Sequence, residues 1–553
     1  MSERQKWYGW GSEDKTFDLA RRPAFWPYLK EKLGIDPKLK TPPVALESLR
    51  LPPLAIPSKL TDKLEAIVGS NSIRDDDYAR ITHSTGKSYF DLIRIRRGII
   101  DNPPDLVVYP ETITQIAEVL KIAAENKISI TPFGGGTSVV GGVEPMRAKN
   151  HSASISLDMS RMNKMIELDE KSLLATFEAG IRGPSLEGHL QKRGYTLGHF
   201  PQSFEYSTLG GWLATRSAGQ QSDRYGKIEN MVCSVTMVTP CGIISTPDAP
   251  YPAIGPSTKD LIIGSEGLFG VIARARMIIH RLPQVQLYRG ILFRDFASGI
   301  QAVREIAQAR LRPATMRLSD EAETEMAIKM HAESESLFET AVMKAGRWYL
   351  RSKGYESSAL MILGFEDTTA AAQKGLKTAL EIASNYGGIN IGSSAGEAWF
   401  RTRFEPPYLR DLLLDHAIMV DTLETSTTWN ILEHVYRSVK NAIEKAITNF
   451  EQSTPPLVLC HISHSYPEGA SLYFTFMAKQ TPSREAEQWQ AVKVAAMDAI
   501  LAAGAAISHH HGIGRDHLHW AHLQHGKPVI EALSAVKKVL DPEGILNPGK
   551  FLT

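Results

Sequence analysis

A glycine-rich loop, Pro132 to Gly142, is the first stretch of this sequence with an evident chemical use. It carries five glycines, three of them consecutive, with Thr137 and Ser138 directly after the three. Glycines let backbone N–H groups converge on a phosphate and allow the positive φ angles that such a loop needs. The pattern is neither Gly-x-Gly-x-x-Gly nor a Walker loop, so it does not favour a nicotinamide or phosphate-transfer site. Taken alone, it is equally typical of an ordinary glycine-rich turn.

A run of three histidines, His509 to His511, is the second candidate for chemistry, and it precedes Gly512-Ile513-Gly514. Imidazoles have pKa values near neutrality, so they suit proton transfer and the binding of anionic groups. In an extended stretch, His509 and His511 would face one way and His510 the other. A solvent-exposed run is the alternative interpretation. A metal site would need further ligands from elsewhere in the chain, and we predict no metal.

Tyr473, Arg410 and Arg317 have residue types that suit a site, but their patterns also fit ordinary structural roles. Tyr473 lies in the alternating stretch Ser471 to Phe476, which predicts a strand and is typical of a core tyrosine. Arg410 precedes Asp411, a pattern typical of a surface ion pair. A guanidinium can bind a carboxylate or phosphate, but the residues alone do not assign that role to Arg410 or Arg317. The residues alone leave these alternatives open.

The first half of the chain predicts the elements that position the glycine loop. Thr112 has the residue type of a helix cap and precedes Ile113 to Leu120, which predicts a helix. The apolar run Ile128 to Ile130 predicts a strand that leads directly into the glycine loop. Further short strands are predicted at 154–157, 174–179 and 232–238. This pattern indicates an α+β domain that ends at about residue 283.

From residue 284 the pattern changes to strand, helix and strand, at 285–293, 297–309 and 359–364, which resembles a ferredoxin-like half. A helix over 485–503 and a helix that ends at Leu540 flank the histidine run. We therefore predict four parts: a partly helical N-terminal extension over 1–100, a first domain over 101–283, a second domain over 284–480 and a C-terminal helical segment over 481–553.

The composition is that of an ordinary globular protein. The 553 residues carry a formal net charge of +1, which gives no argument for a nucleic-acid partner. The three cysteines cannot form a disulfide framework, so a reducing compartment is expected. The N-terminal residues lack the pattern of a secretory signal, and no stretch is apolar enough for a spanning helix. We expect a soluble protein that can still lie on a membrane surface.

Several motifs together resemble the vanillyl-alcohol-oxidase-type, or PCMH-type, FAD-binding superfamily. Pro132 to Ser138 resembles its pyrophosphate loop, and further matches follow in the order of that superfamily: Asp158 to Asn163, Glu178 to Gly180, Thr208 to Thr215, Ser217 to Gly226 and Gly264 to Ile272. The resemblance implies an α+β fold: a PCMH-type FAD-binding domain of two α+β subdomains, a ferredoxin-like α/β substrate domain and a C-terminal helical segment that returns to the FAD domain.

The same resemblance implies that FAD is the cofactor. No histidine lies between Pro132 and Pro145 to tether a flavin, so FAD is expected to be bound non-covalently. The cofactor-binding residues that the resemblance implies are Pro132, Gly134, Gly135, Gly136, Thr137, Ser138, Asp158, Pro201, Ser207, Thr208, Gly210, Gly211, Thr215, Ser217, Gly219, Gly264, Glu266, Gly267, Gly270, Val271 and Ile272.

Other segments resemble the alkyldihydroxyacetonephosphate synthase (alkylglycerone-phosphate synthase) family: Lys6 to Gly11, Leu197 to Ser207, Ala314 to Asp320 and Ser508 to Gly514. That family makes ether lipids by exchanging the acyl group of acyl-dihydroxyacetone phosphate for a long-chain alcohol, with FAD as a non-redox participant. The resemblance implies that Tyr473 is the acid/base group, with a pKa lowered by nearby imidazolium charge. It implies orienting or protonating roles for His509, His510 and His511, and substrate binding by His199, Arg317, Arg410 and His461.

The sequence also departs from that family. The better-known eukaryotic members have arginine where His461 stands, so anion binding there would need a protonated imidazole and would be weaker. Gly544 to Lys550 is more similar to the FAD-dependent 2-hydroxy-acid dehydrogenases of the same superfamily, which are the alternative function (D-lactate or glycolate type). Of their metal-binding motifs only His461 and His511-Gly512 remain, which argues against that alternative.

Location and assembly are expectations from the termini and the resemblance. The C-terminal residues are not a Ser-Lys-Leu peroxisomal address, which favours a bacterial enzyme in the cytoplasm or at a membrane surface. Peripheral membrane contact and a homodimer are family expectations only.

Overall fold

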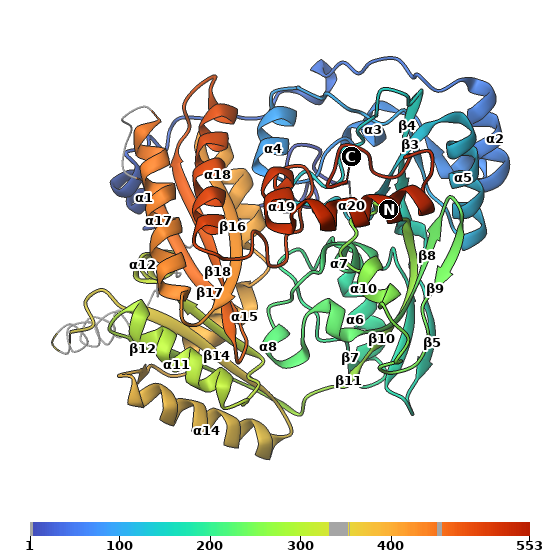
Figure 1. Cartoon of the computed structure of the whole chain (residues 1–553). Helices are drawn as coiled ribbons and strands as arrows, with labels where there is room; N and C mark the ends of the chain where they lie inside the picture. Colours follow the sequence, from blue (N-terminus) through green and yellow to red (C-terminus); the bar gives the residue numbers. More distant parts are fainter. Residues whose placement is uncertain (1–3, 21, 331–351, 353, 451–455, 553) are drawn as a thin grey trace.

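The computed structural model describes residues 4–20, 22–330, 352, 354–450 and 456–552. A four-stranded, a five-stranded and a seven-stranded sheet, with the helices that cover them, make up most of the fold, which confirms the predicted α+β class. In Figure 1 the teal and green strands of the first two sheets lie at the right, and the yellow to orange strands of the third lie at the left.

The four-stranded sheet presents the glycine loop. In sheet order its strands are β1 (Ile73–Arg74), β2 (Leu106–Val108), β4 (Ala153–Asp158) and β3 (Ile128–Phe133). Strands β2, β4 and β3 are parallel, and α5 (Ile113–Asn126) leads into β3. As predicted, the Thr112 side chain caps α5 by accepting the N–H of Gln115. The glycine loop therefore leaves the carboxyl end of a buried parallel strand, where open sheets of this kind bind ligands.

The five-stranded sheet is antiparallel and carries the other predicted cofactor segments. In sheet order its strands are β5 (Met165–Asp169), β6 (Leu174–Glu178), β10 (Val271–Ile278), β8 (Val232–Thr239) and β9 (Gly242–Ser245). Helix α7 (Leu209–Thr215) begins at the capping residue Thr208 and packs against β10. The loop from α10 (Thr258–Ile262) into β10 contains Glu266, whose φ of 49° is in the left-handed region.

The seven-stranded sheet is antiparallel throughout. In sheet order its strands are β15 (Ile389–Asn390), β12 (Val285–Phe293), β14 (Ala359–Asp367), β13 (Thr315–Ser319), β17 (Leu457–Ser465), β18 (Gly469–Lys479) and β16 (Ile418–Thr428). The helices that pack against one face are α11 (Phe296–Gln308), α14 (Thr369–Asn385) and α17 (Leu432–Asn449). The other face meets α12 (Glu321–Met330), α15 (Ser394–Thr402) and α16 (Pro406–Leu414), and it carries the candidate site.

Both ends of the chain pack onto these sheets. The N-terminal stretch contains the expected short helices: α1 (Phe25–Leu33), α2 (Ser58–Val68), α3 (Asp77–Thr82) and α4 (Tyr89–Arg96). Helix α1 shares a buried apolar cluster with α12, α16 and strands of the seven-stranded sheet. The C-terminal helices are α18 (Glu485–Ala502), α19 (Leu518–His525) and α20 (Lys527–Leu540).

The chain then returns to the first sheet, as predicted. Ile130 of β3 donates its N–H to the carbonyl of Ile545, and Asn547 donates to the carbonyl of Ile130, both at 2.8 Å. Helix α20, red in Figure 1, packs on the loop before β10, where Lys537 donates to the carbonyl of Leu268 at 2.8 Å. Among the described residues, no helix is long and apolar enough to span a membrane.

Candidate active site

A cavity of about 1700 Å³ lies between the glycine-rich loops and the open face of the seven-stranded sheet. Sites for single small molecules have volumes of roughly 300–1,000 Å³, so this cavity has room for a dinucleotide and a further ligand. Predicted cofactor residues in its wall are Pro132, Gly134, Gly135, Gly136, Thr137, Ser138, Pro201, Ser207, Thr208, Gly210, Gly211, Thr215, Ser217, Glu266, Gly267, Gly270, Val271 and Ile272. Predicted reaction and substrate residues in the same wall are Tyr473, His510, His511, Arg317, Arg410 and His461.

The other predicted cofactor residues lie behind this wall. The Asp158 carboxylate faces His83, with 2.9 Å between Oδ2 and Nε2. The Gly219 carbonyl accepts a hydrogen bond from His464. Gly264 has a φ of 86°, and a Cβ there would lie 2.7 Å from Arg216 Nε. In the described structure these three residues support the cavity wall, and their direct contact with a cofactor stays a prediction.

His199, a predicted substrate ligand, is also behind the wall. It is fully buried, its ring centroid lies 4.8 Å from that of Trp212, and its Nε2 is 3.2 Å from Ser217 Oγ. Burial lowers the pKa of His199 to about 3, with a smaller contribution from His464. A cationic His199 that binds an anionic substrate is therefore not supported by the structure.

The glycine loop fits a flavin dinucleotide. A Cβ at Gly134 would lie 2.3 Å from Thr208 Oγ1, and one at Gly135 would lie 2.0 Å from the Tyr206 carbonyl oxygen. The loop thus packs closely on the segment before α7, and a side chain at either glycine would displace that segment from the cavity wall. Ser138 Oγ accepts the N–H of Gly142 at 3.0 Å, which holds the loop closed.

Strand pairing places the reaction residues in one row across the seven-stranded sheet. Ser319 pairs with His461, His461 with Tyr473, and Tyr473 with Glu424, on β13, β17, β18 and β16 in turn. Residues directly opposite each other share a face, with Cβ atoms roughly 4.5–5.5 Å apart. Tyr473 is therefore flanked by an imidazole on one side and a carboxylate on the other.

The histidine loop, residues 508–514, covers this row. The ring of His510 stacks on Tyr473 with centroids 6.0 Å apart, and the ring of His511 meets it edge-on at 5.6 Å. His509 instead points to Tyr466, with 2.6 Å between Nε2 and the hydroxyl oxygen. The alternation expected of an extended stretch does not apply, because the chain bends at these residues. His509 does not line the cavity in the described structure, so a direct catalytic role for it stays a prediction.

His464, His509 and His510 each place a ring nitrogen within 4.8 Å of the other two. Several of these nitrogens have protein partners. His464 Nε2 donates to the Gly219 carbonyl at 2.9 Å, and His509 Nδ1 lies 2.9 Å from His510 Nδ1. These contacts account for the cluster without an ion, and operation of the site without a metal stays a prediction.

Protonation states in the row differ from the sequence-based expectation. Burial raises the pKa of Tyr473 to about 12, aided by the Glu424 carboxylate and opposed by a hydrogen bond from Thr422. Burial also lowers the pKa of His510 and His511, although Glu424 acts in the opposite direction. The expected imidazolium that lowers the Tyr473 pKa is therefore wrong. Near neutral pH the structure has a protonated phenol beside neutral imidazoles.

Arg317 and His461 contact each other in the wall. Arg317 Nη1 donates to His461 Nε2 at 2.7 Å, and its Nη2 donates to Glu323 Oε1 at 2.8 Å. Burial, and then the Arg317 charge, lower the pKa of His461. Anion binding by a protonated His461 is therefore not supported, because its Nε2 accepts from Arg317 instead. Arg317 remains the cation on this side of the cavity, shared with Glu323.

Arg410 of α16 offers the freest cationic group. Its Nη1 donates to the Lys87 carbonyl at 2.7 Å, while Nε and Nη2 are buried with no hydrogen-bond partner among the described residues. The neighbouring Asp411 is buried, accepts the N–H of Trp10 at 2.8 Å and pairs with Lys6 at 3.5 Å, so the alternative of a surface ion pair is wrong. A guanidinium with two unpaired nitrogens in a cavity wall is a binding group for a carboxylate or phosphate.

An apolar stretch of the wall extends away from the row toward α12 and α16, while Asp18, Arg22, Lys329, Arg401 and Glu405 also line the cavity. This apolar stretch, which the sequence alone does not locate, can take long hydrocarbon chains. Its lining residues include Met326, Ile328, Leu409, Leu413, Val420, Leu459 and Met477.

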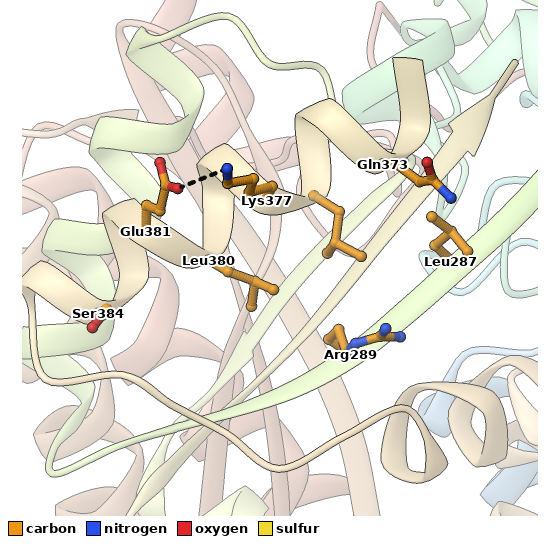
Figure 2. Close-up of a pocket in the computed structure, with 8 residues that line it drawn as sticks. Leu287, Arg289, Gln373, Lys377, Leu380, Glu381 and Ser384 are labelled. Atoms are coloured by element: carbon orange, nitrogen blue, oxygen red, sulfur yellow. Dashed lines mark ion pairs between the residues drawn. The ribbon is translucent and has the colours of Figure 1, made fainter. Parts of the chain in front are cut away.

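A smaller pocket of about 480 Å³ lies on the opposite face, between β12 and α14 (Figure 2). Leu287 and Leu380 line it, and Lys377 pairs with Glu381 at 4.0 Å on its rim. None of the predicted site residues is in its wall. It is therefore separate from the reaction site.

Sequence reasoning missed Glu424 and Glu323. The Glu424 side chain is fully buried and accepts hydrogen bonds from the Ser508 hydroxyl and from the backbone N–H groups of His509, His510 and His511. Burial acts to raise its pKa, but the charges that His510, His511 and His509 take when protonated at low pH, together with these N–H groups, hold the pKa well below the ordinary value. Only the strand register, which the sequence does not display, sets Glu424 beside Tyr473.

Comparison with known proteins agrees with this site. Residues 104–246 match the FAD binding domain, and residues 282–551 match the C-terminal domain of FAD linked oxidases. The fold and the site thus define a flavoprotein of the PCMH type, with FAD as its cofactor.

The relatives narrow the class further. An alkyldihydroxyacetonephosphate synthase of Trypanosoma brucei brucei is 35% identical over 100% of this chain and 92% of its own length. A solved structure of an alkyldihydroxyacetonephosphate synthase superposes with a TM-score of 0.84, at 32% identity and 98% coverage of both chains. The mitochondrial D-lactate dehydrogenase [cytochrome] 1 of Saccharomyces cerevisiae is more distant, at 22% identity over 89% of this chain and 79% of its own length. The chain belongs to the alkyldihydroxyacetonephosphate synthase family and is an FAD-dependent enzyme of that type.

Proposed function

We propose that this enzyme exchanges the acyl group of acyl-dihydroxyacetone phosphate for a long-chain alcohol. The products are alkyl-dihydroxyacetone phosphate and a free fatty acid, and there is no net redox change. The observation that carries the proposal is that one cavity combines a flavin cradle, the Tyr473 row, an Arg410 guanidinium with two nitrogens that have no partner among the described residues, and an apolar stretch of wall. A small hydroxy acid would leave most of that apolar wall unused.

The protonation state of each cavity residue determines whether it can accept a proton, donate a proton or bind an anion. Neutral His510 or His511 can accept a proton from the substrate carbon, and the protonated Tyr473 hydroxyl can donate to an oxygen. Arg410 can bind the phosphate of the substrate or the carboxylate that leaves. The apolar wall orients the two chains at the reacting carbon. FAD held by the glycine loops would supply an electron-poor ring system for this chemistry.

Product analysis tests the proposal. The purified holoenzyme is incubated with palmitoyl-dihydroxyacetone phosphate and hexadecanol, and mass spectrometry follows the ether product and palmitate. We expect equimolar ether and palmitate without an added electron acceptor. Anaerobic stopped-flow absorbance addresses the dehydrogenase alternative. If D-lactate or glycolate bleaches the flavin and an acceptor restores it over many turnovers, the synthase proposal fails.

We further propose a cytoplasmic enzyme that binds FAD without a covalent tether, meets its lipid substrates at a membrane surface and acts as a homodimer. The apolar cavity wall supports the membrane contact, because long-chain alcohols partition into bilayers. Co-sedimentation with phosphatidylcholine vesicles tests the contact, sedimentation equilibrium tests the dimer, and release of FAD by acid precipitation tests the missing tether. Protein that stays in the supernatant would overturn the membrane contact. A monomer would overturn the dimer, and FAD that remains on the pellet would overturn non-covalent binding.

A further inference from the structure

Two carboxylates, the buried Glu424 and the half-buried Glu266, hold the backbone of the histidine loop. Glu424 of β16 accepts the N–H groups of His509, His510 and His511 together with the Ser508 hydroxyl. Glu266, from the loop that enters β10, accepts the N–H groups of Ile513 at 2.6 Å and Gly514 at 2.8 Å.

These carboxylates come from opposite walls of the cavity. Glu424 belongs to the seven-stranded sheet, and Glu266 belongs to the five-stranded sheet's flavin-side loop. Gly512 lies between their two sets of bonds, with a φ of 86°, and a Cβ there would lie 2.9 Å from Glu266 Oε1. The loop therefore bridges the two walls by carboxylate-to-backbone bonds. Those to Glu424 are charge-assisted, because its pKa is held well below the ordinary value, whereas burial raises the pKa of Glu266.

We propose that Glu424 and Glu266 are positioning residues that clamp the histidine loop across the cavity and so fix His510 and His511 over Tyr473. The expected effect on kcat rests on the proposed function, whereas the expected loosening of the histidine loop does not. Neither carboxylate needs to touch the substrate. Each acts through the loop backbone, and removal of either should loosen the segment that it holds.

Glu424 also acts on the imidazoles through its charge. The buried carboxylate lies 3.8 Å from His510 Nδ1 and 3.7 Å from His511 Nδ1, and it opposes the effect of burial on their pKa values. Without this charge the pKa of both imidazoles falls further. On acidification, a variant that lacks the Glu424 charge should therefore lose activity at a lower pH than the wild type does. The loss of a merely structural residue would not cause this shift.

Hydrogen–deuterium exchange on the FAD-loaded enzyme tests the clamp without reference to activity. We expect Glu424→Gln to speed exchange of the 509–511 amides by about tenfold or more, and Glu266→Gln to do the same at 513–514. Asp105→Asn is the matched control, because Asp105 is 1% exposed and accepts the N–H groups of Ala55 and Ser154 outside the cavity. It should leave exchange at 508–514 unchanged.

Kinetics complete the test. Glu424→Gln should lower kcat by about 10- to 100-fold, with a smaller change in KM, because the Arg410 and apolar contacts remain. Its acid limb should move to lower pH, and Glu424→Asp should restore part of kcat. Wild-type exchange at 509–511 in Glu424→Gln would overturn the clamp. If Glu424→Gln does not fold, the Glu266→Gln variant decides the question. Unchanged exchange of the 513–514 amides in that variant would by itself overturn the clamp. If the wild type forms no ether product, the proposed function is refuted, but the hydrogen–deuterium exchange test of the clamp stays valid.

Discussion

At the scale of single residues, the site pairs an acid and a base whose protonation states are set by burial. Tyr473 is buried beside Glu424, so its phenol stays protonated, while His510 and His511 are buried and stay neutral. Desolvation disfavours the charged form of both groups, and it therefore raises one pKa and lowers the other. The two proton-transfer partners are thereby ready in the neutral state near pH 7.

Tyr473→Phe should lower kcat by about 100-fold or more, because positioned acid–base groups contribute roughly 10²–10⁴-fold. FAD binding and the melting temperature should change little, since the phenyl ring keeps its packing against His461 and His510. Tyr386→Phe is the control, because the Tyr386 hydroxyl binds Glu305 away from the cavity. Labelled-alcohol incorporation measures both variants, and a fully active Tyr473→Phe enzyme would remove Tyr473 from the mechanism.

The pH profile follows from the same pKa directions. An imidazole base works only when neutral, so activity should persist below the ordinary histidine pKa of 6.5 and fall only at lower pH. The Tyr473 acid stays protonated up to a pH of about 12, so no alkaline loss is expected from it between pH 7 and 10. The dependence of kcat/KM on pH checks this, and an acid limb at or above pH 6.5 would contradict it.

At the scale of elements, the glycine loops are held by close backbone packing. Gly135→Ala should destabilise the fold by about 1–3 kcal/mol and weaken FAD binding, since the new Cβ would lie 2.0 Å from the Tyr206 carbonyl oxygen. Gly188→Ala in α6 (Gly183–Gln191) is the matched control, because nothing lies within 4 Å of its added Cβ. It should stabilise by about 0.5–1 kcal/mol. Thermal unfolding and flavin absorbance measure both, and equal behaviour of the two variants would refute the packing argument.

The sequence predicted elements well where local signals decide them. Thr112 as a helix cap, the strand into the glycine loop and the strand over Val285–Phe293 are all present. It could not predict the row from Ser319 to Glu424, because antiparallel register depends on partners distant in sequence. The protonation of Tyr473 was mispredicted for the same reason: burial and the Glu424 neighbour are tertiary properties.

At the scale of the whole molecule, the cavity belongs to no single sheet. Its wall combines the loops of the first two sheets, one face of the third, residues of the N-terminal stretch such as Phe17 and Arg22, and the histidine loop. Each part covers apolar or charged groups of another, so cofactor, sheets and chain ends should respond together to perturbation.

Removal of FAD should therefore lower the stability of the entire enzyme. At a free FAD concentration of about 100 times its Kd, a cofactor that binds only the folded state stabilises by about 2.7 kcal/mol. Calorimetry of apoenzyme and holoenzyme measures the difference. NAD at the same concentration is the control, because the loop pattern does not favour a nicotinamide dinucleotide. Identical melting of apoenzyme and holoenzyme would show that the cavity does not couple the sheets.

The pairing of Ile130 with residues 545–547 has a consequence for biosynthesis. During translation the β3 strand leaves the ribosome some four hundred residues before the segment that covers its edge, and the histidine loop emerges almost as late. In the nascent chain the edge of β3 and the flavin cradle therefore stay uncovered until nearly the whole chain has been synthesised. Ribosome stalling before residue 508 should yield a chain that forms its early sheets but has no assembled reaction row.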